Sequence, residues 1–164
     1  MIKKKTNIAV FISGRGTNLK ALILRSKKKK CNYKVAYVIS NKKNAAGLKI
    51  AKKNKIITKI ISKSFLKTEQ KKLAKILINK DIKFICLAGF MKILNPYFLN
   101  FFKNKIINIH PSLLPKYKGL NTHKRALKAK DKFSGCTIHY VSKKLDSGKI
   151  IAKKKVKILK KDTL

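Results

Sequence analysis

Short apolar runs alternate along the chain with polar stretches of helical periodicity. Apolar runs that end at turn-forming residues predict buried strands, and they cover residues 8–12, 33–39, 56–61, 84–88, 106–110, 137–141 and 150–158. Amphipathic or capped stretches predict helices after residue 18, over 45–53 and 68–79, after residue 95, and from 123 through 127. This order predicts an α/β fold with a Rossmann-like, mostly parallel sheet and helices on both faces. We expect a single domain over residues 1–164, because no linker or internal repeat interrupts the pattern.

Length and cysteine content narrow the class of protein. A chain of 164 residues is long enough to bury a core, and no apolar run reaches the roughly 18 residues that a membrane span needs. The apolar stretch before Ser13 is too short for the core of a signal peptide. The three cysteines, Cys31, Cys86 and Cys136, form no Cys-x-x-Cys pair. We therefore expect a cytoplasmic protein without a membrane span, a disulfide framework or a zinc site.

The charge is strongly positive. Lysine and arginine number 44 against five acidic residues, a formal net charge of +39, and such an excess is typical of nucleic-acid binders. Only three of the 44 are arginines, the residue that binds phosphate with two parallel hydrogen bonds. The lysines are spread over the whole chain with many isoleucines and asparagines, which share A/T-rich codons. We interpret the charge as the product of an A/T-biased genome, and nonspecific affinity for nucleic acid follows from it physically.

A glycine-rich loop follows the first predicted strand. It reads Ser13-Gly-Arg-Gly-Thr-Asn18 and leads directly into a predicted helix. In open parallel sheets, ligands bind beyond the carboxyl ends of the strands, where a helix start offers free N–H groups to an anion. The loop matches neither the dinucleotide-binding glycine pattern nor a P-loop. We favour phosphate binding over the alternative of a tight turn in which Thr17 or Asn18 caps the helix.

A second group of polar residues follows the predicted strand 106–110. Asn108 and His110 are two positions apart on this strand, so their side chains point to the same face. An amide donor beside an imidazole suits a reaction that develops an oxyanion and moves a proton. Asp146 lies in a predicted turn between two strands, and a carboxylate there could orient the imidazole. Each residue alone is more simply a core or turn residue, but together they predict a proton-transfer site without a metal.

Other polar and aromatic residues are assigned structural roles. His139 alternates within the predicted strand 137–141, which favours a structural role. His123 begins a predicted helix, although the loop before it keeps this residue eligible for the site. The remaining residues that we assign to the core are Cys86, Cys136, Tyr97, Phe98, Phe101 and Phe102.

Five motifs carry a resemblance to the phosphoribosylglycinamide formyltransferases. They lie at residues 12–19, 38–41, 87–94, 108–115 and 145–148, and the resemblance runs from Ile8 to about Leu164. His-Pro-Ser-Leu-Leu-Pro with Leu-Asp-Ser-Gly marks the wider group of folate-dependent formyltransferases. The Ser-Gly-x-Gly-Thr-Asn loop and the run at 87–94 belong to the glycinamide branch. This resemblance implies the formyltransferase fold, and it implies transfer of a formyl group from 10-formyltetrahydrofolate to glycinamide ribonucleotide in purine synthesis.

The resemblance also implies a role for each matching residue. The ribonucleotide phosphate would be held by Gly16, Thr17 and Asn18. The folate would be contacted by Lys67, Met91, Lys92, Ile93, Leu94, Asn108, Ser142, Lys143, Lys144, Leu145 and Asp146. Asn108, His110 and Asp146 match the catalytic trio of the family.

The implied mechanism is direct transfer. The glycinamide amine attacks the N10-formyl carbon, and a tetrahedral intermediate forms. Asn108 and protonated His110 stabilise its oxyanion, while Asp146 supports His110 and helps to relay a proton to N10 through water. The mechanism needs no metal and no covalent enzyme intermediate.

The chain departs from the family pattern in three ways. Family members continue well past the position of Leu164, so we expect a chain that is short at its C-terminus. Where the family uses an arginine to contact folate, the candidates here are Leu66 and Lys67, and Lys67 replaces only the charge. The lysine content exceeds the family norm.

Other functions stay open at this point. A formyltransferase acting on initiator methionyl-tRNA and a formyltetrahydrofolate hydrolase share the fold, and the basic surface would suit the first. A non-catalytic, basic RNA-binding remnant of the fold is the alternative from another class. The expected partners are the small-molecule substrates, without a membrane, and the chain would act as a monomer or a homodimer.

Overall fold

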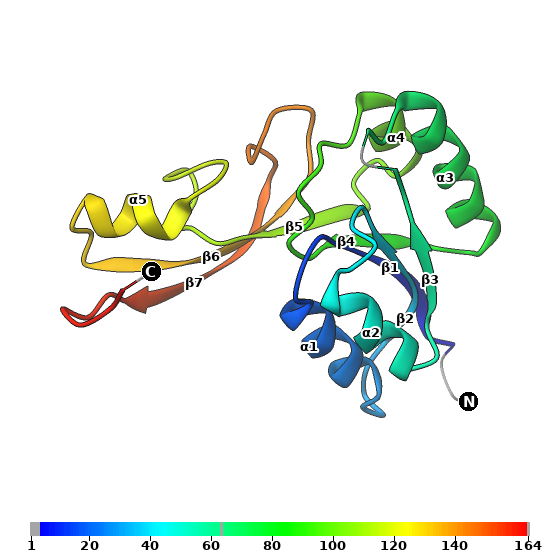
Figure 1. The fold of residues 1–164 in the computed structure, drawn as a ribbon, viewed down its shortest axis with the longest axis horizontal. Helices are drawn as coiled ribbons and strands as arrows, with labels where there is room; N and C mark the ends of the chain where they lie inside the picture. Colours follow the sequence, from blue (N-terminus) through cyan, green and yellow to red (C-terminus); the bar gives the residue numbers. More distant parts are fainter. Residues whose placement is uncertain (1–3, 63, 164) are drawn as a thin grey trace. The chain divides into compact units, whose positions relative to one another are not determined.

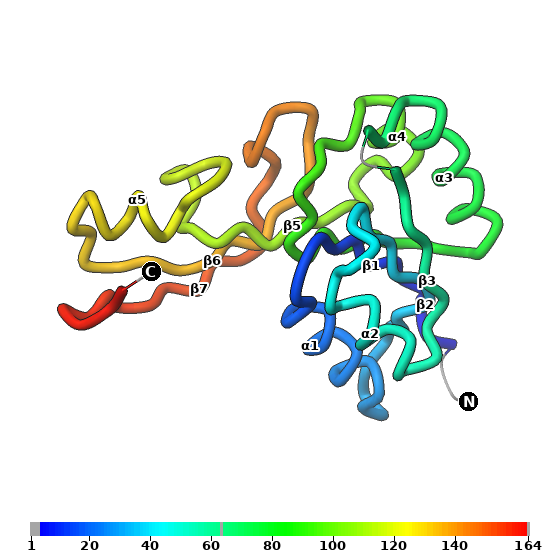
Figure 2. The backbone as a smooth tube through the Cα atoms, in the orientation of Figure 1, coloured from blue at the N-terminus to red at the C-terminus, as the bar shows by residue number. Residues whose placement is uncertain are grey.

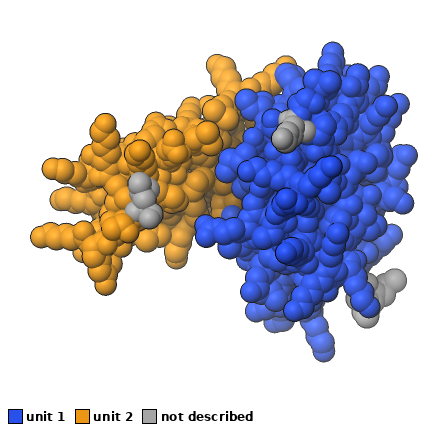
Figure 3. Space-filling model, in the orientation of Figure 1, with its two compact units in different colours: residues 1–106 blue, residues 107–164 orange. Residues whose placement is uncertain are grey.

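The computed structural model describes residues 4–62 and 64–163. The chain divides into two compact units, unit 1 with residues 1–106 and unit 2 with residues 107–164 (Figure 3). The single domain expected over residues 1–164 stays a prediction, and each unit is described by itself. Within the described residues, no helix combines the length and the apolar character that crossing a membrane requires.

Unit 1 is built on a parallel sheet. The strand order is β3-β2-β1-β4, and all three pairs are parallel. The bounds of these strands are β1 Thr6–Ile12, β2 Tyr33–Ser40, β3 Ile57–Ile60 and β4 Phe84–Leu87. The helices between and after them are α1 Thr17–Ser26, α2 Ala46–Lys53, α3 Lys67–Asn79 and α4 Pro96–Phe101 (Figure 1). The predicted α/β order is confirmed, with element ends within a few residues of the expected ones.

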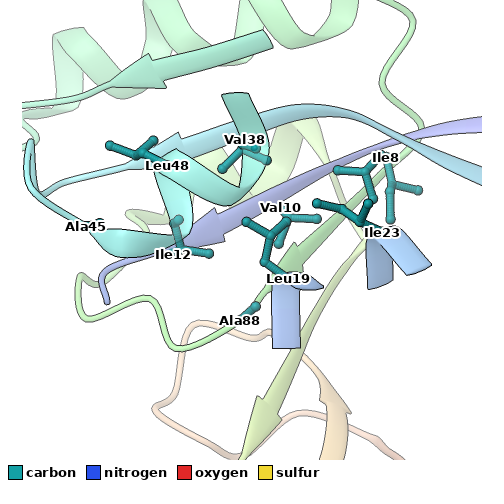
Figure 4. Packing of buried hydrophobic residues seen from close by; sticks show 11 residues of the cluster. Ile8, Val10, Ile12, Leu19, Ile23, Val38, Ala45, Leu48 and Ala88 are labelled. Carbon is teal, nitrogen blue, oxygen red and sulfur yellow. The ribbon is translucent and has the colours of Figure 1, made fainter. Parts of the chain in front are cut away.

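Both faces of this sheet are covered by helices. Ile8, Val10 and Ile12 alternate along β1 and join one core cluster with residues of α1 and α2 (Figure 4). Phe11 points to the opposite face, where its ring centroid lies 6.0 Å from that of Phe98 on α4. Because β1 is buried on both sides, its sequence is a continuous apolar run instead of an alternating one.

Helix α4 begins as its sequence predicts. The side chain of Asn95 accepts a hydrogen bond of 2.8 Å from the backbone N–H of Phe98, and Pro96 occupies the first turn. The predicted core position is confirmed for Phe98 and Phe102, which are buried. Tyr97 and Phe101 are only half-buried.

Unit 2 carries the antiparallel strands. Its elements are β5 Ile106–His110, of which all but the first residue belong to unit 2, α5 Thr122–Lys128, β6 Phe133–Tyr140 and β7 Ile150–Lys157 (Figures 1 and 2). Strand β6 pairs antiparallel with both β5 and β7. The expected start of the sixth strand at residue 137 is wrong, because β6 already begins at Phe133. The small residues Ser134 and Gly135 hide that start, since neither has the branched or aromatic side chain typical of a strand.

Candidate active site

The pairing of β5 with β6 gathers four polar side chains in unit 2. Asn108 lies opposite His139 and His110 lies opposite Thr137 in the antiparallel register. His110, Thr137 and His139 are all buried. Alternation along each strand therefore sends these side chains to one face of the sheet.

Asp146 reaches this face from the turn between β6 and β7. Its backbone has a φ of 43°, and the turn closes at Gly148, where a Cβ atom would lie 1.7 Å from the carbonyl oxygen of Tyr140. Only glycine fits that approach. The turn thereby returns the Asp146 carboxylate, whose side chain is 8% exposed, to the two histidines.

The Asp146 carboxylate has three neighbours. Its Oδ2 atom lies 3.3 Å from Nδ1 of His110 and accepts a hydrogen bond of 2.9 Å from the backbone N–H of Gly119. Its Oδ1 atom lies 3.6 Å from Nε2 of His139. The structure thus brings Asp146 and His110 together as the sequence predicted, while their catalytic role stays a prediction.

His110 has acceptors at both ring nitrogens. Its Nε2 atom lies 2.9 Å from the carbonyl oxygen of Tyr117, and its Nδ1 atom faces Asp146. A carbonyl and a carboxylate accept hydrogen bonds, so an imidazolium has an N–H for each of them and a neutral imidazole has only one. The arrangement can therefore hold His110 as a proton donor with a matched negative charge beside it.

The loop that follows β5 is fixed by Thr137. The Thr137 hydroxyl donates to the carbonyl of Ser112 at 2.7 Å and accepts from the backbone N–H of Leu114 at 3.0 Å. Both bonds are buried. They hold the His-Pro-Ser-Leu-Leu-Pro segment against β6, and nothing in the sequence pattern pointed to Thr137 for this task.

A second carboxylate anchors the same loop further on. The Tyr117 hydroxyl donates to Oδ2 of Asp131 at 2.9 Å, and the Lys116 ammonium lies 3.1 Å from Oδ1. These hydrogen bonds, that from Tyr117 first, hold the pKa of the Asp131 carboxyl below its ordinary value, and the same bond raises the pKa of Tyr117. Asp131 therefore steadies the loop whose Tyr117 carbonyl faces His110.

An acid-dependent stability follows from this lowered pKa. The stabilisation from Asp131 is present above the carboxyl pKa of the unfolded chain, about 3.9, and is lost as the pH falls through the lower pKa of the folded chain. At neutral pH, we expect the free energy of unfolding to be larger for the unmodified protein than for the Asp131→Asn variant. Denaturant titrations at several pH values should show this difference shrinking below about pH 4. A difference that stays constant down to pH 2 would contradict the assignment.

The glycine-rich loop of unit 1 provides a helix start without a side-chain cap. Gly16 is the N-cap of α1 with a φ of 78°, and no side chain of the described residues caps this helix. Thr17 and Asn18 are exposed and lie inside α1, so the alternative in which one of them is the N-cap is wrong. The backbone N–H groups at the start of α1 are thus open to an anion.

Ser13 links this loop to the segment after β4. Its hydroxyl donates to Oδ1 of Asn41 at 2.6 Å and accepts from the backbone N–H of Met91 at 2.8 Å. The side chains of Met91 and Ile93 are 60% and 78% exposed. Leu94, in contrast, is buried. Within unit 1, therefore, an apolar surface lies beside the candidate phosphate loop.

Lys67 lies at the start of α3. Its ammonium is 5.9 Å from the centre of the Tyr97 ring, and the buried Gln70 connects this turn to the backbone N–H of Asn95 at 3.0 Å. The exposed Lys67 can therefore offer a positive charge on the same side of unit 1 as the start of α4.

The other predicted folate residues lie in the turn of unit 2. Ser142, Lys143, Lys144 and Leu145 are exposed, and the Ser142 hydroxyl donates to the carbonyl of Lys144 at 3.0 Å. This hydrogen bond shapes the backbone just ahead of Asp146.

Two further histidines differ in their surroundings. His123 is exposed on α5 and lines a groove with Ala126 and Leu127. His139, which the sequence assigned a structural role, lies 3.3 Å from the Asn108 amide nitrogen. The contact between His139 and Asn108 could have been predicted only from the register of β5 against β6, and the sequence alone does not give this register.

Comparison with known proteins gives matches along the whole chain. The family described as formyl transferase matches residues 6–164. The phosphoribosylglycinamide formyltransferase of Haemophilus influenzae is 43% identical over 160 residues, which cover 96% of this chain and 76% of that protein. The crystal structure of phosphoribosylglycinamide formyltransferase from Anaplasma phagocytophilum has a TM-score of 0.92 at 42% identity, covering 98% of this chain and 76% of that one.

A larger relative contains a similar segment. The trifunctional purine biosynthetic protein adenosine-3 of Chironomus tentans is 43% identical over 165 residues, which cover 98% of this chain. The chain spans only 12% of the length of that trifunctional protein.

Proposed function

We propose that this chain, which belongs to the formyl transferase family, transfers the formyl group of 10-formyltetrahydrofolate to the amine of glycinamide ribonucleotide. One observation carries the proposal: the buried His110–Asp146 pair, 3.3 Å apart, lies in a chain similar throughout to phosphoribosylglycinamide formyltransferases. The reaction is a step of de novo purine synthesis. We place it in the cytoplasm, in accord with three free cysteine thiols.

The proposed reaction exchanges one carbon–nitrogen bond for another. The glycinamide amine attacks the formyl carbon, and the carbonyl oxygen of the tetrahedral intermediate becomes negatively charged. The bond to N10 then breaks, the amine loses one proton and N10 gains one. Asn108 would donate to the oxyanion, and the His110 imidazolium would do so once its Nε2–H leaves the Tyr117 carbonyl. Each such donor contributes roughly 10²–10³ in rate.

Asp146 has two tasks in this proposal. Its carboxylate balances the charge of the His110 imidazolium, which is supported by the contact between Oδ2 and Nδ1. It also helps to pass the proton to N10 through water. The backbone N–H of Gly119 fixes the carboxylate in place for both tasks.

We assign candidate substrate-binding residues to each unit by itself. The start of α1, with Gly16, Thr17 and Asn18, would hold the ribonucleotide phosphate. Each unit also has its own candidate residues for folate binding. Those of unit 1 are Lys67, Met91, Lys92, Ile93 and Leu94, and those of unit 2 are Asn108, Ser142, Lys143, Lys144, Leu145 and Asp146. Lys67 supplies a point charge to the folate, without the paired hydrogen bonds of an arginine.

A folate-consumption assay separates the proposal from its rivals. We expect the absorbance change of 10-formyltetrahydrofolate loss to require glycinamide ribonucleotide. Loss of the folate without any acceptor would instead show a hydrolase, and loss that requires methionyl-tRNA would show the tRNA-directed formyltransferase. Salt-sensitive RNA binding by folded protein without folate loss would show the RNA-binding remnant.

A further inference from the structure

His139 is a buried polar side chain next to Asn108. It is 2% exposed, and its Nδ1 atom lies 2.9 Å from the carbonyl oxygen of Tyr140. Its Nε2 atom lies 3.3 Å from the Asn108 amide nitrogen. The proposed mechanism gives His139 no task, although both of its nitrogens have partners.

We propose that His139 is a neutral positioning residue, which accepts a hydrogen bond from Asn108 and so orients this amide for the oxyanion. The inference rests on the proposed formyl transfer. The Tyr140 carbonyl can only accept, so the ring proton of His139 lies on Nδ1. In a neutral ring, Nε2 then carries a lone pair, and the Asn108 amide group donates to it.

The charges around the cluster favour a neutral His139. One carboxylate, that of Asp146, faces two imidazole rings, at 3.3 Å for His110 and 3.6 Å for His139. Protonating both rings would leave an uncompensated positive charge among buried groups, and such a charge is costly. The carboxylate lies closer to His110 than to His139, and the second nitrogen of His110 also faces an acceptor, so His110 takes the proton and His139 stays neutral.

The hydrogen bond to His139 settles which way the Asn108 amide faces. An asparagine amide has two N–H groups and one oxygen, and rotation by half a turn exchanges them. With one N–H committed to His139, the second N–H is fixed in the amide plane and is free to donate to the oxyanion. His139 would act only through Asn108, because it supplies no group to the reacting atoms.

Two substitutions separate hydrogen bonding from packing. His139→Leu removes the acceptor and keeps an apolar side chain, whereas His139→Gln can place an amide oxygen near the position of Nε2. We expect His139→Leu to lower kcat about tenfold to a hundredfold, a part of what one oxyanion donor contributes. The KM values should change less than about threefold, and His139→Gln should restore most of kcat. Lys128→Leu, on the exposed face of α5, is the control and should leave kcat unchanged.

A double-mutant cycle tests the coupling to Asn108. In an Asn108→Ala background, we expect His139→Leu to cost less than about twofold in kcat, because the amide that it orients is gone. Thermal melting of each variant identifies the folded ones. Full additivity of the two changes, or equal kcat for the leucine and glutamine variants, would overturn the proposal.

A spectroscopic test is independent of activity. Long-range nitrogen–proton NMR spectra of the unmodified chain at neutral pH should show one neutral imidazole with its proton on Nδ1, and this signal should vanish in His139→Gln. A His139 ring protonated on Nε2 or on both nitrogens would overturn the proposal. If the chain consumes no folate but shows the expected tautomer, the proposed function fails while the hydrogen-bonding part of this inference stands.

Discussion

Replacing Asp146 by asparagine is expected to lower kcat for formyl transfer by about 10³-fold or more, by analogy with other sites in which a carboxylate pairs with a catalytic imidazole. The substitution keeps the size of the side chain and removes its charge. The His110 imidazolium then loses the partner that lies 3.3 Å from its Nδ1 atom. The proton relay to N10 loses its base at the same time. Steady-state assays of folate consumption with saturating substrates measure the effect.

A matched acid elsewhere in unit 2 controls for the loss of charge. Asp162 accepts a hydrogen bond of 2.9 Å from the backbone N–H of Leu159 near the end of the described chain and is exposed. We expect Asp162→Asn to keep kcat within about twofold of the unmodified value, because interactions of an exposed charged side chain contribute little to the stability of the fold. A loss of less than tenfold in Asp146→Asn, with the protein folded, would remove Asp146 from the catalytic account.

Replacing Gly16 by alanine is expected to weaken ribonucleotide binding and to destabilise unit 1. A Cβ atom at this position would lie 2.6 Å from the Cα atom of Gly47, and the φ of 78° strains any other residue. The start of α1 must therefore move away from α2. We expect the KM for the ribonucleotide to rise at least about tenfold, because small displacements of a binding group have large effects. The free energy of unfolding should fall by roughly 1–3 kcal/mol.

The neighbouring glycine provides the control. Gly14 has no atom within 4 Å of an added Cβ, so Gly14→Ala changes the composition of the loop without a clash. We expect its KM for the ribonucleotide to stay within about threefold of the unmodified value. Denaturant unfolding and initial-rate kinetics of both variants make the comparison, and equal behaviour of the two alanine variants would contradict the phosphate-loop assignment.

Unit 1 follows closely from the sequence because its signals are local. The apolar run in β1, the Asn95-Pro96 start of α4 and the glycine before α1 each act on neighbouring residues. The start of β6 at Phe133 was missed, since its strand conformation depends on pairing with residues of β7. The antiparallel direction of β6 could not be predicted either, because it depends on pairing with strands that are distant in the chain.

In the candidate site, too, the residues whose placement depends on local sequence could be predicted, and those placed by distant contacts could not. Asn108 and His110 could be predicted together because alternation on one strand is local. Asp146 was predicted as an acid in a turn, but its approach to His110 depends on the closure at Gly148. His139 was assigned a structural role because its contact with Asn108 arises from the register of two strands 31 positions apart.

The measurement that tests the central claim most directly follows the formyl carbon. The unmodified chain is incubated with glycinamide ribonucleotide and with 10-formyltetrahydrofolate labelled with ¹³C in the formyl group, and the products are separated. The account predicts that the label appears in a new amide on the ribonucleotide, at a rate that depends on both substrates. Label found only in formate, or label that never leaves the folate in the presence of folded protein, would contradict it.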